Sequence, residues 1–416
     1  MTPEVKKRIE QIRQGIVPEG YKKGKIGIVP IKWNEVPFST LFTSTSEYTD
    51  DLEQYPLYSL TIEDGITAKT ERYERSHLVK KENSYKVVRP NDYAYNPMNI
   101  RFGAVARHKG DIPVAVSGYY DIFTTVHESD LVFMDSFLTY GPMITYYNKV
   151  STGSLVEKQR VHFSDFLEFS LALPTLEERK KIAAILSTQD KAIELQARKI
   201  EELKRFKKGC LEKMFPRKGQ KVPEKRFPGF TDNWEQRKFE EIAVRSSVIC
   251  SDANIPRVEY EDIVSGAGRL NKDIYAKQSS KSGIAFHQGD VLYGKLRPYL
   301  RNWLLPTFDG LAVGDFWVLQ PQNADSSFLY RLIQSRQFDE VANQSTGTKM
   351  PRADWELVSK TVFSIPSKIS EQAAIGTYFT TLDNLITLHQ RKLEEMKRQK
   401  KALMQLLLTG IVRVKA

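Results

Sequence analysis

The sequence predicts an α+β protein in which two globular domains with mixed, β-rich cores are separated by two long helices that pair as a coiled coil. Three observations support this prediction. A stretch of 31 residues recurs 193 positions later, both copies have coiled-coil periodicity, and short β-branched and aromatic runs fill the segments that precede them. An internal duplication therefore organises the chain.

The repeat relates residues 178–208 to residues 371–401. A shift of 193 positions gives 14 identical residues without a gap. The matches include isolated positions such as Glu178 with Glu371 and Asp190 with Asp383. A low-complexity Lys/Glu helix would not match by chance at such positions as well, so we interpret the similarity as a true duplication.

The apolar residues of each copy are spaced alternately by three and four positions, which is typical of a coiled-coil seam. The predicted seam consists of Ile182, Ile185, Ile193, Ile200, Leu203, Ile375, Tyr378, Leu382, Ile386, Leu393, Met396 and Leu403. A helix of roughly 37 residues would be about 55 Å long at 1.5 Å per residue, so the pair would act as a spacer. The alternative is that each helix is an ordinary amphipathic helix packed on its own domain.

The positions of turn and linker residues, together with the changes in sequence pattern, predict five regions. They are a lead-in helix and linker (1–28), a first globular domain (29–173), a central helix (174–216), a linker with a second globular domain (217–365), and a distal helix with the C-terminal tail (366–416). Runs such as Tyr85–Val88, Asp92–Tyr95 and Ile144–Tyr147 predict strands in the first domain. The two domains match at their ends but not in their middles, which indicates that a common frame was kept while the interior diverged.

Composition limits the class of protein. The net charge is +11, which suits a phosphate-rich partner, and the two cysteines, Cys210 and Cys250, offer neither a disulfide framework nor a cysteine zinc site. No run of 18 apolar residues and no signal-peptide core is present, so we expect a cytoplasmic protein that does not enter membranes.

Three catalytic signatures are incomplete. The stretch Gly289–Leu296 fits a phosphate-binding loop except that Leu296 stands where a magnesium-binding Ser or Thr is needed, and its middle alternates like a strand. The stretch Asn96–Asn99 is similar to the Asn-Pro-Pro-Tyr motif of amino-methyltransferases but lacks its second proline and its aromatic residue. Neither clustered carboxylates nor histidines at ligand spacing are found, and His389 fits a packed seam position better than a metal site. We therefore expect no catalytic residue and no metal ligand in this chain.

Basic residues set among polar and aromatic ones are the remaining candidates for function, because Lys and Arg neutralise phosphates and Arg also reads base edges. The alternative for each of them is ordinary solvated surface charge. The candidates for binding DNA are Lys69, Arg72, Arg75, Lys80, Lys81, Arg101, Arg107 and Lys109 in the first domain, and Arg269, Lys272, Lys277, Lys281, Lys295, Arg297, Arg301, Lys349 and Arg352 in the second.

Over essentially its whole length the chain resembles the specificity (S) subunits of type I restriction–modification systems. The motifs that carry the resemblance are Trp234–Phe239, Gly289–Pro298, Ser345–Pro351, and Ile365-Pro366 followed by Glu371-Gln372 and the long helix. The first half carries weaker versions, namely Asn96–Arg101, Ser151–Gly153, and Leu173-Pro174 with Glu178-Arg179. Asn96 stands where the second half has Gly294, and Arg179 stands where it has Gln372.

The resemblance implies a non-catalytic subunit. Its two globular domains would be target recognition domains that each read one half of a split double-stranded DNA sequence, held apart by an antiparallel helix pair with pseudo-two-fold symmetry. Partners implied are two methyltransferase (M) subunits, which methylate adenine with S-adenosylmethionine, and restriction (R) subunits, which cleave with ATP. No cofactor is expected in this chain, since S-adenosylmethionine, ATP and magnesium would bind the partner subunits.

Two other classes of function remain as alternatives. A stand-alone nuclease or methyltransferase would be active without partners. A coiled-coil DNA-binding or adaptor protein would have no role in restriction and modification, and a pure adaptor would show no DNA sequence preference. The bases recognised, the gap between the half-sites and the helix faces that bind the M subunits do not follow from the sequence, because base contacts depend on loop geometry and on DNA shape.

Overall fold

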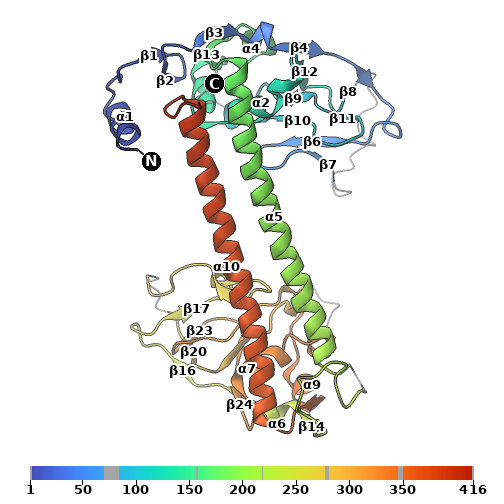
Figure 1. Cartoon of the computed structure of the whole chain (residues 1–416). Helices are drawn as coiled ribbons and strands as arrows, with labels where there is room; N and C mark the ends of the chain where they lie inside the picture. The colour runs from blue at the N-terminus through green and yellow to red at the C-terminus, as the bar shows by residue number, and fades with distance from the viewer. Residues whose placement is uncertain are drawn as a thin grey trace. The chain divides into compact units, whose positions relative to one another are not determined.

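The computed structural model describes residues 2–69, 84–155, 158–217, 219–276, 281–344 and 350–414. The chain divides into two compact units, Met1–Leu195 with Leu393–Ala416, and Gln196–Lys392. The helices α5 (Leu176–Met214) and α10 (Ile369–Leu408) each run from one unit into the other (Figure 1). Each unit therefore contains a globular head and one half of each long helix, whereas the sequence suggested that the helices are regions of their own.

The first head is built from short strands and the helices α1 to α4. Its elements in chain order are α1 (Pro3–Arg13), β1 (Tyr21–Gly24), β2 (Gly27–Pro30), β3 (Asn34–Pro37), β4 (Phe42–Thr45), β5 (Tyr48–Thr49), β6 (Tyr58–Thr61), β7 (Gly65–Ala68), β8 (Tyr85–Val88), β9 (Tyr93–Tyr95), β10 (Val105–Arg107), β11 (Val114–Ser117), β12 (Asp121–Thr125), α2 (Leu131–Phe137), α3 (Gly141–Val150), α4 (Phe163–Leu167) and β13 (Ser170–Leu173).

Two antiparallel sheets form the centre of the first head. The larger has the strand order β10-β9-β12-β4 and the smaller has the order β11-β8-β5, while β1-β2, β3-β13 and β6-β7 form two-stranded pairs. Aromatic rings fill the core on one face of the larger sheet, where Phe123 stacks on Tyr93 with ring centroids 5.1 Å apart and meets Phe42 edge-on at 4.9 Å. This apolar packing fixes the sheet whose edge strand β10 ends at the candidate residue Arg107.

One predicted strand is wrong. Residues Ile144–Tyr147 lie in the helix α3, not in a strand. Pro142 occupies the first turn of that helix, and Met143 and Tyr147, four positions apart, turn together into the core. The β-branched and aromatic composition suggested a strand, but the helical spacing of the buried residues determined the structure.

The second head repeats this architecture with different loops. Its elements are β14 (Glu235–Lys238), α6 (Phe239–Ile242), β15 (Ala243–Ser246), β16 (Ile249–Cys250), β17 (Arg257–Val258), β18 (Ile263–Val264), β19 (Arg269–Leu270), β20 (Gly283–Phe286), β21 (Val291–Gly294), β22 (Trp303–Leu304), β23 (Gly310–Ala312), β24 (Phe316–Pro321), α7 (Ser326–Leu332), α8 (Arg336–Ala342), α9 (Trp355–Lys360) and β25 (Val362–Ile365).

The main sheet of the second head has the strand order β15-β24-β21-β22. Read from its other edge, this order corresponds strand for strand to β10-β9-β12-β4 of the first head. A second sheet has the order β16-β20-β23-β17, in which β17 and β23 are parallel, and β18-β19 and β14-β25 form pairs. In both heads a strand near the start pairs with the last strand of the head, β3 with β13 and β14 with β25. These paired ends are the common frame that the sequence comparison detected.

A buried glutamate joins each head to its helix in the same way. In the first unit, the Trp33 indole N–H donates to Glu178 over 3.2 Å, and the Arg413 guanidinium forms two hydrogen bonds with the same carboxylate at 2.7 and 2.8 Å. In the second unit, Trp234 and Arg226 hold Glu371 with a matching set of bonds at 3.2, 2.6 and 2.7 Å. Arg226 follows α5 and Arg413 follows α10. The linker after α5 therefore supplies the arginine for Glu371, and the C-terminal tail after α10 supplies the equivalent arginine for Glu178.

The two long helices pack side by side and antiparallel within each unit. In the first unit, Ile182 and Leu186 of α5 share a core with Leu407 and Leu408 of α10. In the second unit, Met214 of α5 shares a core with residues of α10, which are Ile375, Phe379 and Leu382. The start of α5 therefore packs on the end of α10 in the first unit, and the end of α5 packs on the start of α10 in the second, so the two helices are antiparallel.

Polar contacts along the helix pair follow the 193-residue repeat. Lys207 pairs with Asp383 at 2.6 Å, and the repeat-related Lys400 pairs with Asp190 at 2.5 Å. Gln196 donates to Nδ1 and to the carbonyl oxygen of His389, at 2.8 and 2.9 Å, and these two residues are themselves repeat-related. A residue that contacts its own counterpart marks the centre of an antiparallel pair of equal helices.

Close packing of α10 on α7 depends on Gly376. A Cβ at this position would lie 1.8 Å from Ser327 Oγ and 2.9 Å from the Ser327 backbone carbonyl carbon. Gly376→Ala is therefore expected to destabilise the protein by about 1–3 kcal/mol, although alanine favours helices. Chemical denaturation of the full chain measures this loss. The matched control is Ala183→Gly at the repeat-related position of the first unit, which should cost only about 1 kcal/mol through helix propensity. Equal losses for the two variants would contradict the steric argument.

Candidate nucleic-acid interface

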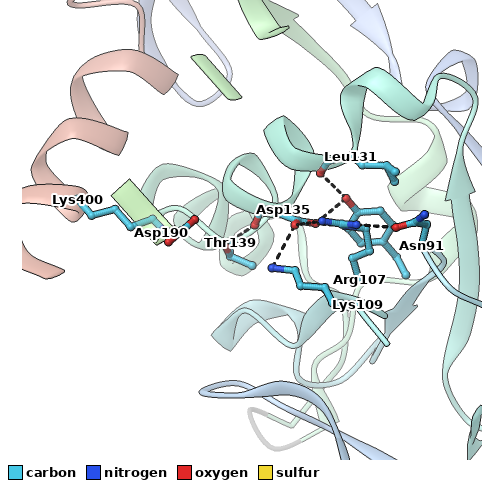
Figure 2. Close-up of polar contacts among 9 residues, drawn as sticks. Asn91, Arg107, Lys109, Leu131, Asp135, Thr139, Asp190 and Lys400 are labelled. Carbon is cyan, nitrogen blue, oxygen red and sulfur yellow. Dashed lines mark hydrogen bonds and ion pairs between the residues drawn. The ribbon is translucent and has the colours of Figure 1, made fainter. Parts of the chain in front are cut away.

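Some of the predicted basic residues of the first head are buried and bonded to other side chains, and others are exposed on the surface. Arg107, at the end of β10, forms two hydrogen bonds with Asp135 of α2 at 2.9 and 2.8 Å and donates to the Asn91 side chain at 2.6 Å (Figure 2). Tyr93 donates to the same carboxylate at 2.8 Å, and burial raises the pKa of Tyr93 well above its usual value. The Arg107 guanidinium is thus held inside the head, and we leave it out of the proposed interface.

Lys109 extends outward from the same cluster. Its ammonium group lies 3.2 Å from Asp135, but 67% of its side chain is exposed. Asn91 has a left-handed backbone with φ of 74°, and its counterpart in the second head, Gly289, has φ of 92°. Each is the third residue of a four-residue turn whose last residue, an aspartate, accepts from the backbone N–H of the first, Asp92 from Arg89 and Asp290 from His287. The turn that contains Asn91, the partner of Arg107, is therefore part of the frame common to both heads.

Arg101 is buried and is also unavailable to a duplex. Only 8% of the residue is exposed, its guanidinium donates to Gln159 at 2.9 Å, and it lies 4.8 Å from the Phe102 ring centroid. Lys69, by contrast, is exposed and has no side-chain partner among the residues that the structure describes. Four other candidates, Arg72, Arg75, Lys80 and Lys81, lie outside the described residues.

In the second head, two motifs far apart in sequence meet at one carboxylate. Leu296 and Arg352 form an antiparallel bridge, and Lys295 and Arg352 both lie against Asp315, at 3.5 and 3.2 Å. The strand β21 occupies the interval between Gly289 and Lys295, so this stretch is not a phosphate-binding loop. Residues 295–297, which follow the buried strand β21, thus lie beside residues 351–353, and the Arg297 backbone N–H donates to the Pro351 carbonyl oxygen at 2.7 Å.

A 3₁₀ turn, Pro298–Leu300, follows this junction and is bracketed by two arginines with left-handed backbones. Arg297 has φ of 49° and Arg301 has φ of 55°. Arg301 pairs with Asp339 at 3.0 Å, whereas the exposed guanidinium of Arg297 has no partner within the described part of the chain. Left-handed non-glycine residues are strained and gather at functional sites, so this turn is the strongest local candidate in the second head.

The other candidates of the second head form a more loosely organised surface. Lys272 lies 2.7 Å from the buried Asp262, and Lys281 lies 3.2 Å from Glu259. Arg269 is exposed in β19 without a side-chain partner among the described residues. Lys277 and Lys349 fall outside those residues. Exposed, partly paired cations of this kind attract phosphates at long range, while the unpaired ones are free for direct contact.

The predicted seam residues lie on α5 and α10, and six of them, Ile182, Ile185, Leu403, Ile375, Tyr378 and Leu382, belong to cores to which both helices contribute. The buried members of the seam are Ile182, Ile200, Ile375, Leu382 and Ile386, and its half-buried members are Ile185, Ile193, Leu203, Tyr378, Leu393, Met396 and Leu403. The polar pair of Gln196 and His389 lies within this seam. The Gln196 amide lies 2.8 Å from Nδ1 of His389 and donates to the His389 carbonyl oxygen, as a packed polar residue at this position would allow.

The described residues contain no cluster of three or more His, Cys, Asp or Glu side chains that would hold a metal ion. Within the same residues, none of the helices has the length and apolarity that crossing a membrane requires. The described candidates for contacting DNA include exposed cations on each head, Lys69 and Lys109 on the first and Arg269, Arg297 and Arg301 on the second.

Sequence reasoning missed the apolar tips of two equivalent turns. The turn Ile100–Phe102 connects β9 to β10, and Pro298–Leu300 connects β21 to β22. Phe102 and Tyr299 are about half exposed, at 50% and 52%. The search for basic residues passed over them, although the shift of 198 positions that aligns Asn91 with Gly289 also aligns the two turns.

Comparison with known proteins gives one family. The family model described as type I restriction modification DNA specificity domain matches residues 135–205 and 232–398, which is more than half of the chain. The type I restriction enzyme MjaVIII specificity subunit of Methanocaldococcus jannaschii is 26% identical over 60% of this chain and 64% of its own length. The type I restriction enzyme EcoDI specificity subunit of Escherichia coli is 24% identical over 47% of this chain and 51% of its own. The chain thus spans between half and two thirds of these curated relatives.

A solved structure shares the fold. The S subunit of a type I restriction–modification system from M. genitalium has a TM-score of 0.54 and 14% sequence identity, and the comparison covers 91% of this chain and 96% of that one. At this identity the likeness concerns the fold alone.

Proposed function

Because the chain belongs to the type I restriction modification DNA specificity domain family, we propose that it selects the DNA sequence on which a type I restriction–modification complex acts. Each head would read one half of a bipartite target, and α5 with α10 would set the gap between the halves. The observation that carries this proposal is the repetition of one frame, a four-stranded sheet joined to a helix through a Trp–Glu–Arg contact, around two different interiors. The common frame would present both heads to DNA in the same way, and their different interiors would let each head recognise a different half-site.

The repeat also supports a partner that binds twice. Contacts along the helices recur with the 193-residue shift, so the pair offers two equivalent faces to two copies of one protein. We propose that these copies are methyltransferase subunits that modify adenine with S-adenosylmethionine, and that restriction subunits joining them use ATP and magnesium. In this proposal the chain supplies sequence recognition and docking, and its partners supply the chemistry.

The test is methylome sequencing of a methylation-free host that expresses the chain with its methyltransferase partner. The expected result is one asymmetric motif made of two short half-sites separated by a fixed gap. A single continuous motif would contradict the assignment of one half-site to each head. Methylation that does not change when this chain is omitted would contradict its role in specificity.

Binding should depend strongly on salt. Exposed cations such as Lys69, Lys109 and Arg269 would displace counterions from DNA, and the logarithm of the affinity then falls by about 0.9 per phosphate contact for each tenfold rise in salt. Titrations of a target duplex and a scrambled duplex at several salt concentrations measure this slope. We expect parallel lines for the two duplexes, since phosphate contacts do not depend on sequence. An affinity that does not change with salt would contradict a phosphate-binding surface.

A further inference from the structure

The two exposed turns, Ile100–Phe102 and Pro298–Leu300, occupy the same place in both heads. Each follows an inner strand of the four-stranded sheet and leads into the edge strand of that sheet, β9 into β10 and β21 into β22. The surrounding loops differ in length and sequence. Both heads have this turn at the same position with an exposed apolar tip, although their interiors differ. We therefore expect the turn to serve a role common to both heads that does not depend on which bases are read.

Each tip stands on a rigid base. Ile100, the first residue of one turn, is completely buried, and Pro298, the first residue of the other, is also buried. Gly103 closes the first turn with φ of 96°, and Arg301 closes the second with φ of 55°. An exposed aromatic ring on a fixed turn is in contact with water in the free protein. A partner that buries the ring would gain hydrophobic free energy.

Charge around the tips favours DNA as that partner. The guanidinium of the buried Arg101 lies 4.8 Å from the ring of Phe102 and adds positive charge to the first tip, although it does not itself reach a duplex. Beside Tyr299 and Leu300, the guanidinium of Arg297 is exposed, and more than half of the Arg301 side chain is exposed although it pairs with Asp339. An apolar surface rimmed by cations matches base faces flanked by phosphates, since every base has a face on which an aromatic ring can stack.

We propose that Phe102 and the Tyr299–Leu300 tip are wedges that contact base faces and open one base step in each half-site. Arg297 would bind the adjacent phosphate or base edge, which explains an arginine at a backbone conformation that glycine adopts without strain. This inference rests on the proposed DNA-reading function and adds to it a contact that deforms DNA and does not select a particular base.

The experiment uses the full chain in complex with its methyltransferase partner and duplexes of the mapped target. 2-Aminopurine replaces, one at a time, adenines of the half-sites that are not methylated, so that base flipping by the methyltransferase does not contribute to the signal. The wild type should raise the fluorescence at one step in each half-site. Phe102→Ala should abolish the rise in one half-site only, and Tyr299→Ala should abolish it in the other. Each variant should bind about tenfold more weakly, because base stacking on an aromatic side chain contributes on the order of 1–3 kcal/mol.

Ile112→Ala and Val248→Ala are matched controls, because these side chains are at least as exposed and lie away from the two turns in sequence. They should leave affinity and fluorescence unchanged. Arg297→Gly removes the guanidinium while it relieves the left-handed backbone, so the variant should fold as stably as the wild type and bind DNA several-fold more weakly.

The outcomes separate this inference from the proposed function. Tip variants that keep both fluorescence rises and wild-type affinity would overturn the wedge, while a bipartite motif in the same samples would leave the proposed function intact. Tip variants that lose assembly with the methyltransferase but keep DNA affinity would show that the tips dock a protein, which also overturns the wedge.

Discussion

Removing residues 193–199 and 386–392 together is expected to shorten the gap in the recognised DNA by about three base pairs. The two segments face each other because they are centred on Gln196 and His389, which are in contact. Seven residues correspond to about 10.5 Å of helix, or roughly three steps of 3.4 Å in DNA. A deletion of one heptad returns the seam to the same face, so the remaining pairs can form again. Methylome sequencing of the host that carries the variant reports the gap directly.

A four-residue deletion centred on the same pair is the control for rotation. It shortens the helices by about 6 Å but also turns the seam by roughly 40°, so we expect impaired methylation as well as a changed gap. The half-sites themselves should be identical in both deletion variants, since neither deletion touches a head. A heptad deletion that leaves the gap unchanged while methylation persists would show that the helices do not act as the spacer.

The helix pair was the part of the fold that the sequence could specify. A 3.5-residue period and a repeat without gaps are local signals, and they need no knowledge of what lies across the core. The strand Tyr85–Val88 was confirmed for a similar reason, because its residues and the turns beside it agree. Residues 144–147 had strand-forming composition, yet the burial of Met143 and Tyr147 on one face made them a helix.

Contacts between distant residues could not be predicted from the sequence. The partner of Glu178 is Arg413, which is 235 positions away, and no local pattern indicates that the C-terminal tail completes the first unit. The same limit applies to the candidate interface. Arg107 and Lys109 have similar sequence surroundings, but a carboxylate on α2, Asp135, holds the first inside the head and leaves the second exposed.

The substitution Arg179→Gln is expected to destabilise the first unit by about 3–5 kcal/mol. Arg179 forms two hydrogen bonds with Asp130 at 2.7 and 2.8 Å, and only 2% of the Asp130 side chain is exposed. Removing the guanidinium leaves a buried carboxylate without its counter-charge, which is among the most costly single changes. Chemical denaturation gives the loss, and amide hydrogen exchange locates it in the first unit.

The second unit shows why this loss comes from charge and not from shape. Gln372 occupies the position that corresponds to Arg179, and there it donates to the Pro366 carbonyl oxygen and accepts from the Asp325 backbone N–H, both at 2.9 Å. Glutamine at the start of such a helix is therefore compatible with the frame. Adding Asp130→Asn to Arg179→Gln removes the unpaired charge and should recover most of the lost stability. A double variant as unstable as Arg179→Gln alone would show that packing around the guanidinium, and not the buried charge, sets the cost.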